Sequence, residues 1–192
     1  LFGMVRSLYD SNRKMPMDGE KDFKKLKKSY SSGKELLGKT IGIIGFGRIG
    51  SNFVKRALAF DMNVYVYDPY INHEKIKKSG AIPIQNFKNN LSKMDAITLH
   101  CPKNEETTNL FTKKDFQTMK KNAIIINCAR GGILNEDDLY EALLNEKIAG
   151  AGLDVFDVEP TPSSHPLVKL KNVILSPHIA GVTVESTGRM AT

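Results

Sequence analysis

Three glycines stand at a fixed spacing directly after a short apolar segment of this sequence. Gly45, Gly47 and Gly50 form a G-x-G-x-x-G pattern behind residues 40–44, which are rich in β-branched side chains. In such a unit the first glycine permits a tight turn, the second lets a pyrophosphate approach the backbone, and the third lets the next helix pack closely on the strand. The helix N-terminus then directs free N–H groups at the phosphates. The glycines alone would also suit a strand-to-helix turn that binds nothing.

An acidic residue follows these glycines at the distance that a dinucleotide site requires. A second apolar segment, 63–67, leads into Asp68, 18 residues after Gly50. A carboxylate at that place can accept hydrogen bonds from both hydroxyls of an adenosine ribose. A cofactor with a 2′-phosphate usually needs a cation there, whereas Pro69 and Tyr70 come next. The pattern therefore predicts binding of NAD rather than NADP.

Apolar segments typical of strands alternate with short segments typical of helices along the rest of the chain. The expected strands are 40–44, 63–67, 81–84, 95–100, 123–128, 149–155 and 173–175, and the expected helices are 51–60, 73–79, 87–93, 112–119 and 135–145. This alternation predicts an α/β fold, a Rossmann-type doubly wound parallel sheet with helices on both faces. Ligands of such sheets bind beyond the carboxyl ends of the strands. The polar side chains expected there are Asp68, Cys101, Arg130, Asp154, Glu159 and His178.

Taken singly, most of these side chains have an ordinary structural explanation. An arginine such as Arg130, placed after a buried strand, often pairs with a helix carboxylate. Glu159 would serve equally well as a solvated loop residue, and His178 as a hydrogen-bonded structural histidine. Cys101 and Cys128 are typical of small buried apolar residues rather than nucleophiles. The sequence assigns no role and no metal site to the other histidines, which are His73, His100 and His165.

The composition is that of an ordinary globular protein. A chain of 192 residues with 41% hydrophobic and 26% charged side chains can form one sizeable domain. No apolar run reaches the roughly 18 residues of a membrane span, and no secretory signal pattern opens the chain. The two cysteines make neither a disulfide framework nor a metal-ligand spacing, which favours a cytoplasmic setting.

The net charge of +7 is concentrated near the N-terminus. Residues 1–40 carry ten Lys and Arg against five Asp and Glu, with most of the excess in 21–34. A nucleic-acid site would interleave aromatic side chains with these cations, but only Phe23 and Tyr30 occur there. The stretch therefore indicates a solvated basic connector, and no nucleic-acid partner is predicted.

Three later segments accompany the glycine motif in a fixed order. They are Asn127-Cys-Ala-Arg-Gly-Gly132, Gly152-Leu-Asp-Val-Phe156 through Glu159-Pro160, and Ser176-Pro-His-Ile-Ala-Gly181. Together with the glycine motif they resemble the D-isomer-specific 2-hydroxyacid dehydrogenase family over nearly the whole chain, most weakly over 13–34. The resemblance implies hydride transfer between nicotinamide C4 and C2 of a small 2-hydroxy or 2-oxo acid. It is strongest to the members that oxidise 3-phosphoglycerate to 3-phosphohydroxypyruvate in serine biosynthesis.

The resemblance implies a catalytic role for three side chains. Arg130 would bind the substrate carboxylate, for which a planar guanidinium is well suited. His178 would act as the general acid and base at the 2-hydroxyl, because imidazole titrates nearest to working pH. Glu159 would hydrogen-bond to His178, fix its tautomer and favour its protonated form.

The same resemblance implies how the cofactor is held. Asp154 would bind the nicotinamide carboxamide, and the backbone around Arg48 and Ile49 would hold the pyrophosphate. The residues expected to contact NAD are Gly45, Gly47, Arg48, Ile49, Gly50, Asp68, Cys101, Cys128, Ala129, Arg130, Asp154, His178, Ala180 and Gly181.

The resemblance also implies a division of the chain. The residue pattern itself predicts an amphipathic lead helix over 1–12 and a basic connector over 13–34, part helix and part loop, both packing on the cofactor domain. Residues 35–183 would form the NAD-binding domain, and 184–192 would begin a helix that returns to a substrate domain. Both ends look cut, so we expect NAD binding with little or no turnover, because the loops that close the substrate pocket would be missing. Relatives imply a homodimer formed through the cofactor domain.

Two other functions fit the same motifs. A glyoxylate or hydroxypyruvate reductase would share them and differ in the substrate pocket. An NAD-sensing transcriptional corepressor would keep the arginine, glutamate and histidine but bind a peptide through another domain. Tests of substrates and of peptide binding would separate these alternatives.

Overall fold

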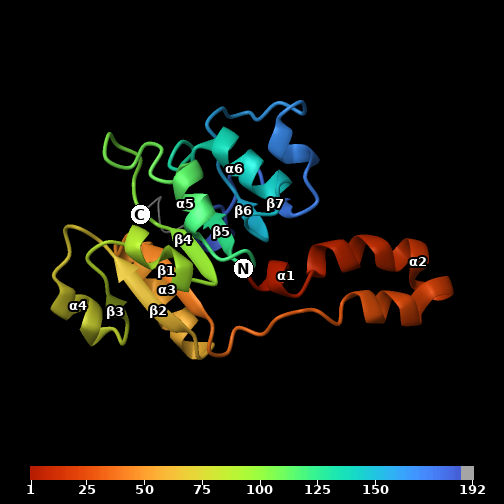
Figure 1. Cartoon of the computed structure of the whole chain (residues 1–192), viewed down its shortest axis with the longest axis horizontal. Helices are drawn as coiled ribbons and strands as arrows, with labels where there is room; N and C mark the ends of the chain where they lie inside the picture. The colour runs from red at the N-terminus through yellow and green to blue at the C-terminus, as the bar shows by residue number, and fades with distance from the viewer. Residues whose placement is uncertain (187–192) are drawn as a thin grey trace.

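Seven parallel strands form a single sheet in the computed structural model, which describes residues 1–186 (Figure 1). The strand order is β3-β2-β1-β4-β5-β6-β7, so the direction of winding reverses between β1 and β4. This reversal is the topological switch point at which such sheets bind ligands. All seven expected strands and the doubly wound fold are confirmed, with the bounds β1 (Thr40–Ile44), β2 (Asn63–Tyr67), β3 (Ile82–Pro83), β4 (Ala96–Leu99), β5 (Ile124–Asn127), β6 (Gly150–Leu153) and β7 (Val173–Leu175).

The helices between the strands also lie where the sequence predicts them, to within a few residues. Two of the elements are 3₁₀-helices, including the one expected over 87–93. The bounds are α1 (Phe2–Val5), α2 (Leu8–Ser29), α3 (Arg48–Ala59), α4 (His73–Lys78), η1 (Lys88–Lys93), α5 (Lys113–Thr118), α6 (Glu136–Leu144) and η2 (Pro166–Lys169).

The central strand β1 sends its side chains alternately into two buried clusters, one on each face of the sheet. Ile41 packs in one cluster with Val54 of α3. Ile44 packs in the other with Phe116 of α5 and Leu139 of α6. Because both faces are covered, most strand residues are apolar. This packing fixes the carboxyl edge of the sheet, where the polar side chains lie.

The glycine motif forms the turn from β1 into α3 at that edge. Gly45 has φ +99°, a left-handed conformation, and it packs against the carbonyl of His100, since a Cβ would lie 2.6 Å from that oxygen. A Cβ on Gly50 would lie 2.0 Å from the carbonyl oxygen of Gly45. A Cβ on Gly47 would meet nothing within 4 Å. The first and third glycines are therefore required by packing, whereas the space at Gly47 is open.

Replacement of Gly50 by alanine is expected to lower the free energy of unfolding by roughly 1–3 kcal/mol, because the added methyl group must displace backbone. Urea denaturation of the chain measures this change. Gly47→Ala is the matched control, and it should leave the stability nearly unchanged while weakening NADH binding. Equal stability of the two variants would contradict this account of the turn.

The N-terminal segment differs from the sequence prediction. The expected break between a lead helix over 1–12 and a connector is wrong, because the chain breaks at Ser7, with φ 50°, and α2 then continues to Ser29. The lysine-rich part of α2 lacks the apolar periodicity by which a helix is recognised in a sequence. At the other end, helical backbone begins at Val184 as expected, and residues 187–192 lie outside the described part.

Only the first turns of this segment pack on the sheet. A Cβ on Gly150 of β6 would lie 2.8 Å from the Cε atom of Met4, so α1 rests on β6. Beyond it, α2 extends away from the body and doubles back at a kink at Asp22 (Figure 1). The Tyr30 hydroxyl donates to the Asp10 carboxylate at 2.8 Å and joins the two limbs. We call residues 8–30 the helical arm. Within residues 1–186, no helix has the length and apolarity that crossing a membrane requires.

Candidate active site

The carboxylate of Asp68 is held beside the glycine turn by two backbone amides. Phe46 N–H donates to Oδ2 at 2.8 Å, and Tyr70 N–H donates to Oδ1 at 2.9 Å. Each oxygen keeps a lone pair for a further donor, such as a ribose hydroxyl. A cavity of about 200 Å³ opens next to this carboxylate, and Gly45, Gly47 and Cys101 are among the residues that line it.

Two side chains from separate loops bridge this cavity. The Tyr70 hydroxyl, from the loop after β2, donates to the carboxylate of Glu106, from the loop after β4. Both side chains line the cavity. No local spacing links positions so far apart in the chain, so the sequence offers no signal for this contact.

The side chains at the end of β4 are not suited to nucleophilic or acid–base chemistry. Burial raises the pKa of the Cys101 thiol, which keeps it protonated. Burial lowers the pKa of His100 to about 4, so its imidazole is neutral. Its Nε2 atom lies 3.1 Å from the Thr98 hydroxyl, and its ring packs on Phe53 at 5.4 Å between centroids. His100 is therefore a neutral imidazole held by Thr98 and Phe53.

The loop after β5 carries Arg130 toward the same edge. Both ends of the Asn127 side chain hold this loop, because Nδ2 donates to the Arg130 carbonyl at 2.9 Å and Oδ1 accepts from Ala129 N–H at 3.0 Å. The Arg130 guanidinium is exposed, and among residues 1–186 no carboxylate forms an ion pair with it. The structural explanation, pairing with a helix carboxylate, therefore does not apply to Arg130.

Close backbone packing brings the Arg130 loop against the loop that carries Glu159. A Cβ on Gly131 would lie 1.8 Å from the carbonyl oxygen of Phe156, so only glycine fits. Cys128 is exposed at this edge, which corrects the expectation of a buried apolar residue. It lies one residue beyond β5, where side chains leave the core.

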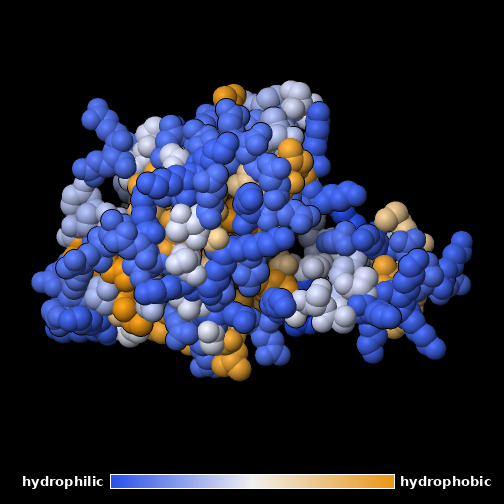
Figure 2. Space-filling view, in the orientation of Figure 1, coloured by the Kyte–Doolittle hydropathy of each residue, from blue (hydrophilic) through white to orange (hydrophobic). Residues whose placement is uncertain are grey.

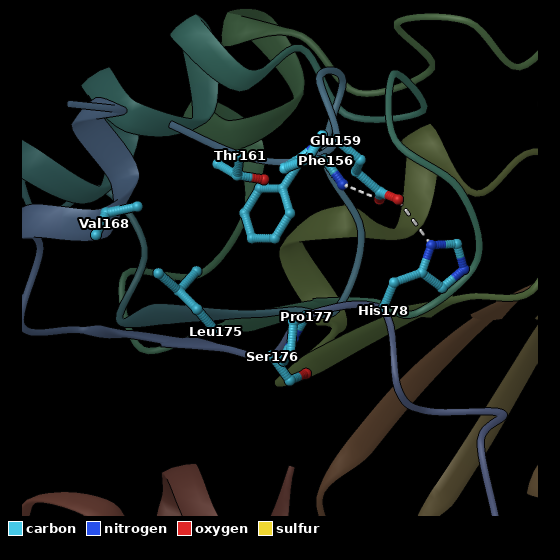
Figure 3. A pocket seen from close by; sticks show the side chains of 9 residues that line it. Phe156, Glu159, Thr161, Val168, Leu175, Ser176, Pro177 and His178 are labelled. Carbon is cyan, nitrogen blue, oxygen red and sulfur yellow. Dashed lines mark hydrogen bonds and ion pairs between the residues drawn. The ribbon is translucent and has the colours of Figure 1, made fainter. Parts of the chain in front are cut away.

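A carboxylate–imidazole pair lies at the carboxyl end of β7 (Figure 3). Glu159 Oε2 and His178 Nδ1 are 2.8 Å apart, and Phe156 N–H donates to Oε1 at 2.9 Å. The hydrogen bonds from His178 and then from Phe156 lower the pKa of Glu159. An ionised carboxylate can only accept, so Nδ1 donates and Nε2 is left on the open side of the ring. The expected contact between Glu159 and His178 is present.

The backbone of His178 is held in a left-handed conformation by a buried carboxylate. His178 has φ 55°, which costs a non-glycine residue energy unless neighbouring groups hold it. Asp154 accepts hydrogen bonds from the Ser176 hydroxyl at 2.5 Å, Ile179 N–H at 2.9 Å and Ala180 N–H at 2.8 Å. Burial opposes ionisation of Asp154, but these hydrogen bonds outweigh it and lower its pKa. Asp154 thus fixes the turn that presents His178.

Beside this pair lies a cavity of about 670 Å³ with mostly apolar walls. Figure 3 shows the carboxylate–imidazole pair at one side of it, with Leu175 and Val168 opposite. The lining residues are Phe156, Glu159, Pro160, Thr161, Val168, Leu175, Ser176, Pro177 and His178.

The expected site residues thus gather along one edge of the sheet. Arg48 and Ile49 open α3, and the Ile49 side chain is exposed. A Cβ on Gly181 would meet nothing within 4 Å, so space is open there. A second carboxylate–imidazole pair, which no local sequence pattern signals, lies in this region. Glu136 Oε2 lies 3.0 Å from His165 Nε2, although His165 showed no patterned partner in the sequence.

Comparison with known proteins identifies the family to which this chain belongs. Residues 1–180 match the family described as D-isomer specific 2-hydroxyacid dehydrogenase, NAD binding domain. A D-3-phosphoglycerate dehydrogenase from Methanocaldococcus jannaschii is 47% identical over 168 residues, which are 88% of this chain and 31% of that protein. A glyoxylate reductase from Korarchaeum cryptofilum is 40% identical over 159 residues, 83% of this chain and 48% of that protein.

Solved structures of other dehydrogenases superpose closely on this chain. The NAD-dependent formate dehydrogenase from Staphylococcus aureus, in complex with NAD, superposes with a TM-score of 0.83 at 34% identity, covering 98% of this chain and 55% of that one. The chain spans about a third of the length of the first curated relatives, 31% for the enzyme from Methanocaldococcus jannaschii. The fold, the dinucleotide turn and these matches together show that the chain belongs to the NAD-binding domain family of the D-isomer-specific 2-hydroxyacid dehydrogenases.

Proposed function

We propose that this chain is the cofactor domain of a dehydrogenase that oxidises 3-phosphoglycerate to 3-phosphohydroxypyruvate. The observation that carries the proposal is the Glu159–His178 contact of 2.8 Å at the sheet edge that also bears the dinucleotide turn. The 47% identity to a D-3-phosphoglycerate dehydrogenase supports this substrate. Residues 35–183 would form the domain proper, residues 1–34 the segment before it, and the chain from residue 184 would lead to a substrate domain.

The residues at the turn fit an NAD molecule. The open space at Gly47 leaves room for a pyrophosphate against the backbone, and Gly45 and Gly50 hold the turn that exposes its N–H groups. The two backbone amides on Asp68 orient its oxygens for ribose hydroxyls. A carboxylate at this position disfavours a 2′-phosphate through charge repulsion, so the arrangement supports NAD over NADP.

The catalytic step follows from the orientation of His178. Nε2 takes the proton of the substrate 2-hydroxyl as the hydride leaves C2, and NAD, when bound, supplies the hydride acceptor. Glu159 holds Nδ1–H, which keeps Nε2 free to accept the proton, and its negative charge stabilises the imidazolium that forms. Arg130 binds the substrate carboxylate through paired hydrogen bonds. In the reverse direction His178 returns the proton to the 2-oxo group.

Substrate choice is tested with a protein that joins this chain to its substrate domain. Turnover with 3-phosphoglycerate should exceed turnover with glycerate and lactate, while the 192-residue chain alone should turn over little. The side chain of His178 is 49% exposed in this chain, so water is not excluded from the proton-transfer site. Preference for glyoxylate or hydroxypyruvate would favour the reductase alternative, which the 40% identity to a glyoxylate reductase supports.

We propose also that the chain forms a homodimer through the cofactor domain, with the N-terminal segment as part of the contact. Large apolar side chains are exposed there, as the scattered apolar surface on the arm in Figure 2 illustrates. They are Phe2, Leu8, Tyr9, Met15, Met17 and Phe23. Burial of such a surface would support association, and sedimentation equilibrium tests it. The free thiols Cys101 and Cys128 support a reducing, cytoplasmic setting.

A further inference from the structure

One carboxylate outside the proposed catalytic pair holds both ends of the loop that carries Glu159. Asp157 N–H, at the start of this loop, donates to Glu136 Oε1 at 2.9 Å. His165 Nε2, at its end, lies 3.0 Å from Glu136 Oε2. The Glu136 side chain is only 12% exposed and that of His165 18%. We call this arrangement of Glu136, Asp157 N–H and His165 the loop clamp.

The partners of Glu136 all belong to the loop, which distinguishes it from an ordinary acidic residue at a helix start. Glu136 is the first residue of α6, but the Asn135 side chain caps this helix by accepting from Asp138 N–H at 3.0 Å. Burial raises the pKa of Glu136, and this effect outweighs the hydrogen bond from Asp157 N–H, which lowers the pKa. A carboxylate that is costly to bury requires partners, and among the described residues these are supplied by the loop.

Apart from Glu136, few contacts fix the imidazole of His165. Its Nδ1 atom is buried without a hydrogen-bond partner in the described structure, so the contact with Glu136 is its polar anchor. Its ring meets Phe156 edge-on at 6.2 Å between centroids. Phe156 in turn donates its N–H to Glu159. Asp157 of the loop clamp therefore directly follows Phe156, whose N–H holds the Glu159 carboxylate.

We propose that Glu136 and His165 are positioning residues, which set the loop 157–165 so that the Glu159 carboxylate reaches His178. The proposal rests on the proposed function for its catalytic meaning. Its geometric part, the dependence of the Glu159 contact on Glu136, stands by itself and is tested without turnover.

The test is NMR of the 192-residue chain with Glu136→Ala. Exchange of the Phe156 N–H with solvent should speed up by about tenfold, because its hydrogen bond to the Glu159 carboxylate weakens when the loop is released. The pKa of Glu159 should rise toward the ordinary value of a glutamate, because its contacts with His178 and Phe156 loosen. Glu136→Gln should restore both readouts, since its carbonyl accepts from Asp157 N–H and its amide donates to a neutral imidazole.

Asn135→Ala is the matched control, because it removes the cap of the same helix and leaves the clamp intact. It should move neither readout. If Glu136→Ala does not fold, His165→Leu fills the space beside Phe156, releases one end of the loop and should shift both readouts in the same direction. Unchanged readouts in these variants, or equal changes in Asn135→Ala, would overturn the proposal. NADH binding by the same samples separates this result from failure of the proposed function.

Discussion

Replacement of His178 by asparagine is expected to lower kcat by about 10²–10⁴-fold in a protein that joins this chain to a substrate domain. The asparagine amide can still donate to Glu159, which His178 Nδ1 contacts at 2.8 Å, and asparagine tolerates the left-handed backbone with φ 55°. The variant therefore keeps the turn and removes only the group that carries the proton. Steady-state kinetics measures the effect, and KM for NAD should change little.

A second variant checks that the loss comes from proton transfer. Glu159→Gln keeps a hydrogen-bond acceptor for Nδ1–H but removes the charge that stabilises the imidazolium, so it should lower kcat less than His178→Asn. Activity of His178→Asn within a few-fold of the unchanged protein would rule out His178 as the acid–base residue.

Replacement of Asp154 by alanine is expected to lower the free energy of unfolding by roughly 1–3 kcal/mol or more, because the hydroxyl of Ser176 and two backbone amides lose their acceptor. These donors lie at 2.5 Å for Ser176, 2.9 Å for Ile179 and 2.8 Å for Ala180. Urea denaturation near neutral pH measures the change. Asp154→Asn keeps one acceptor oxygen, so its free energy of unfolding should lie between those of Asp154→Ala and the unchanged chain.

The effect of Asp154 should depend on pH in a defined direction. Its pKa is lowered in the folded protein, so ionised Asp154 contributes stability above the ordinary range of a carboxyl group. That contribution is lost as pH falls through the lowered pKa. The stability difference between Asp154→Ala and the unchanged chain should therefore narrow in acid. A difference that is small near neutral pH, or that grows in acid, would contradict the role given to this carboxylate.

Local patterns in the sequence were sufficient for the sheet and for the dinucleotide turn. Strand β7 spans Val173–Leu175, as predicted, because this short apolar segment contrasts clearly with its polar surroundings. Gly45 and Gly50 were recognisable because packing against the neighbouring backbone leaves no room for a side chain. The contact between Glu159 and His178 was expected only through the family resemblance.

Other features depend on contacts between distant positions or on the absence of a pattern. Glu136 and His165 are 29 residues apart, and no spacing rule relates a helix start to the end of a loop. The helical arm is polar over much of its length, so apolar periodicity could not reveal it. The exposure of Cys128 follows from its place just beyond the end of β5, which the sequence located only to within one residue.

NAD binding through the glycine turn and Asp68 is tested by calorimetric titration of the 192-residue chain with NADH and, separately, with NADPH, repeated with Asp68→Ala. The Asp68 carboxylate lies beside the turn, held by Phe46 N–H at 2.8 Å. We expect NADH to bind more tightly than NADPH. Asp68→Ala should weaken NADH binding and narrow the difference in affinity between the two dinucleotides. Absence of NADH binding, or equal affinity for both dinucleotides, would contradict NAD binding through the glycine turn and Asp68.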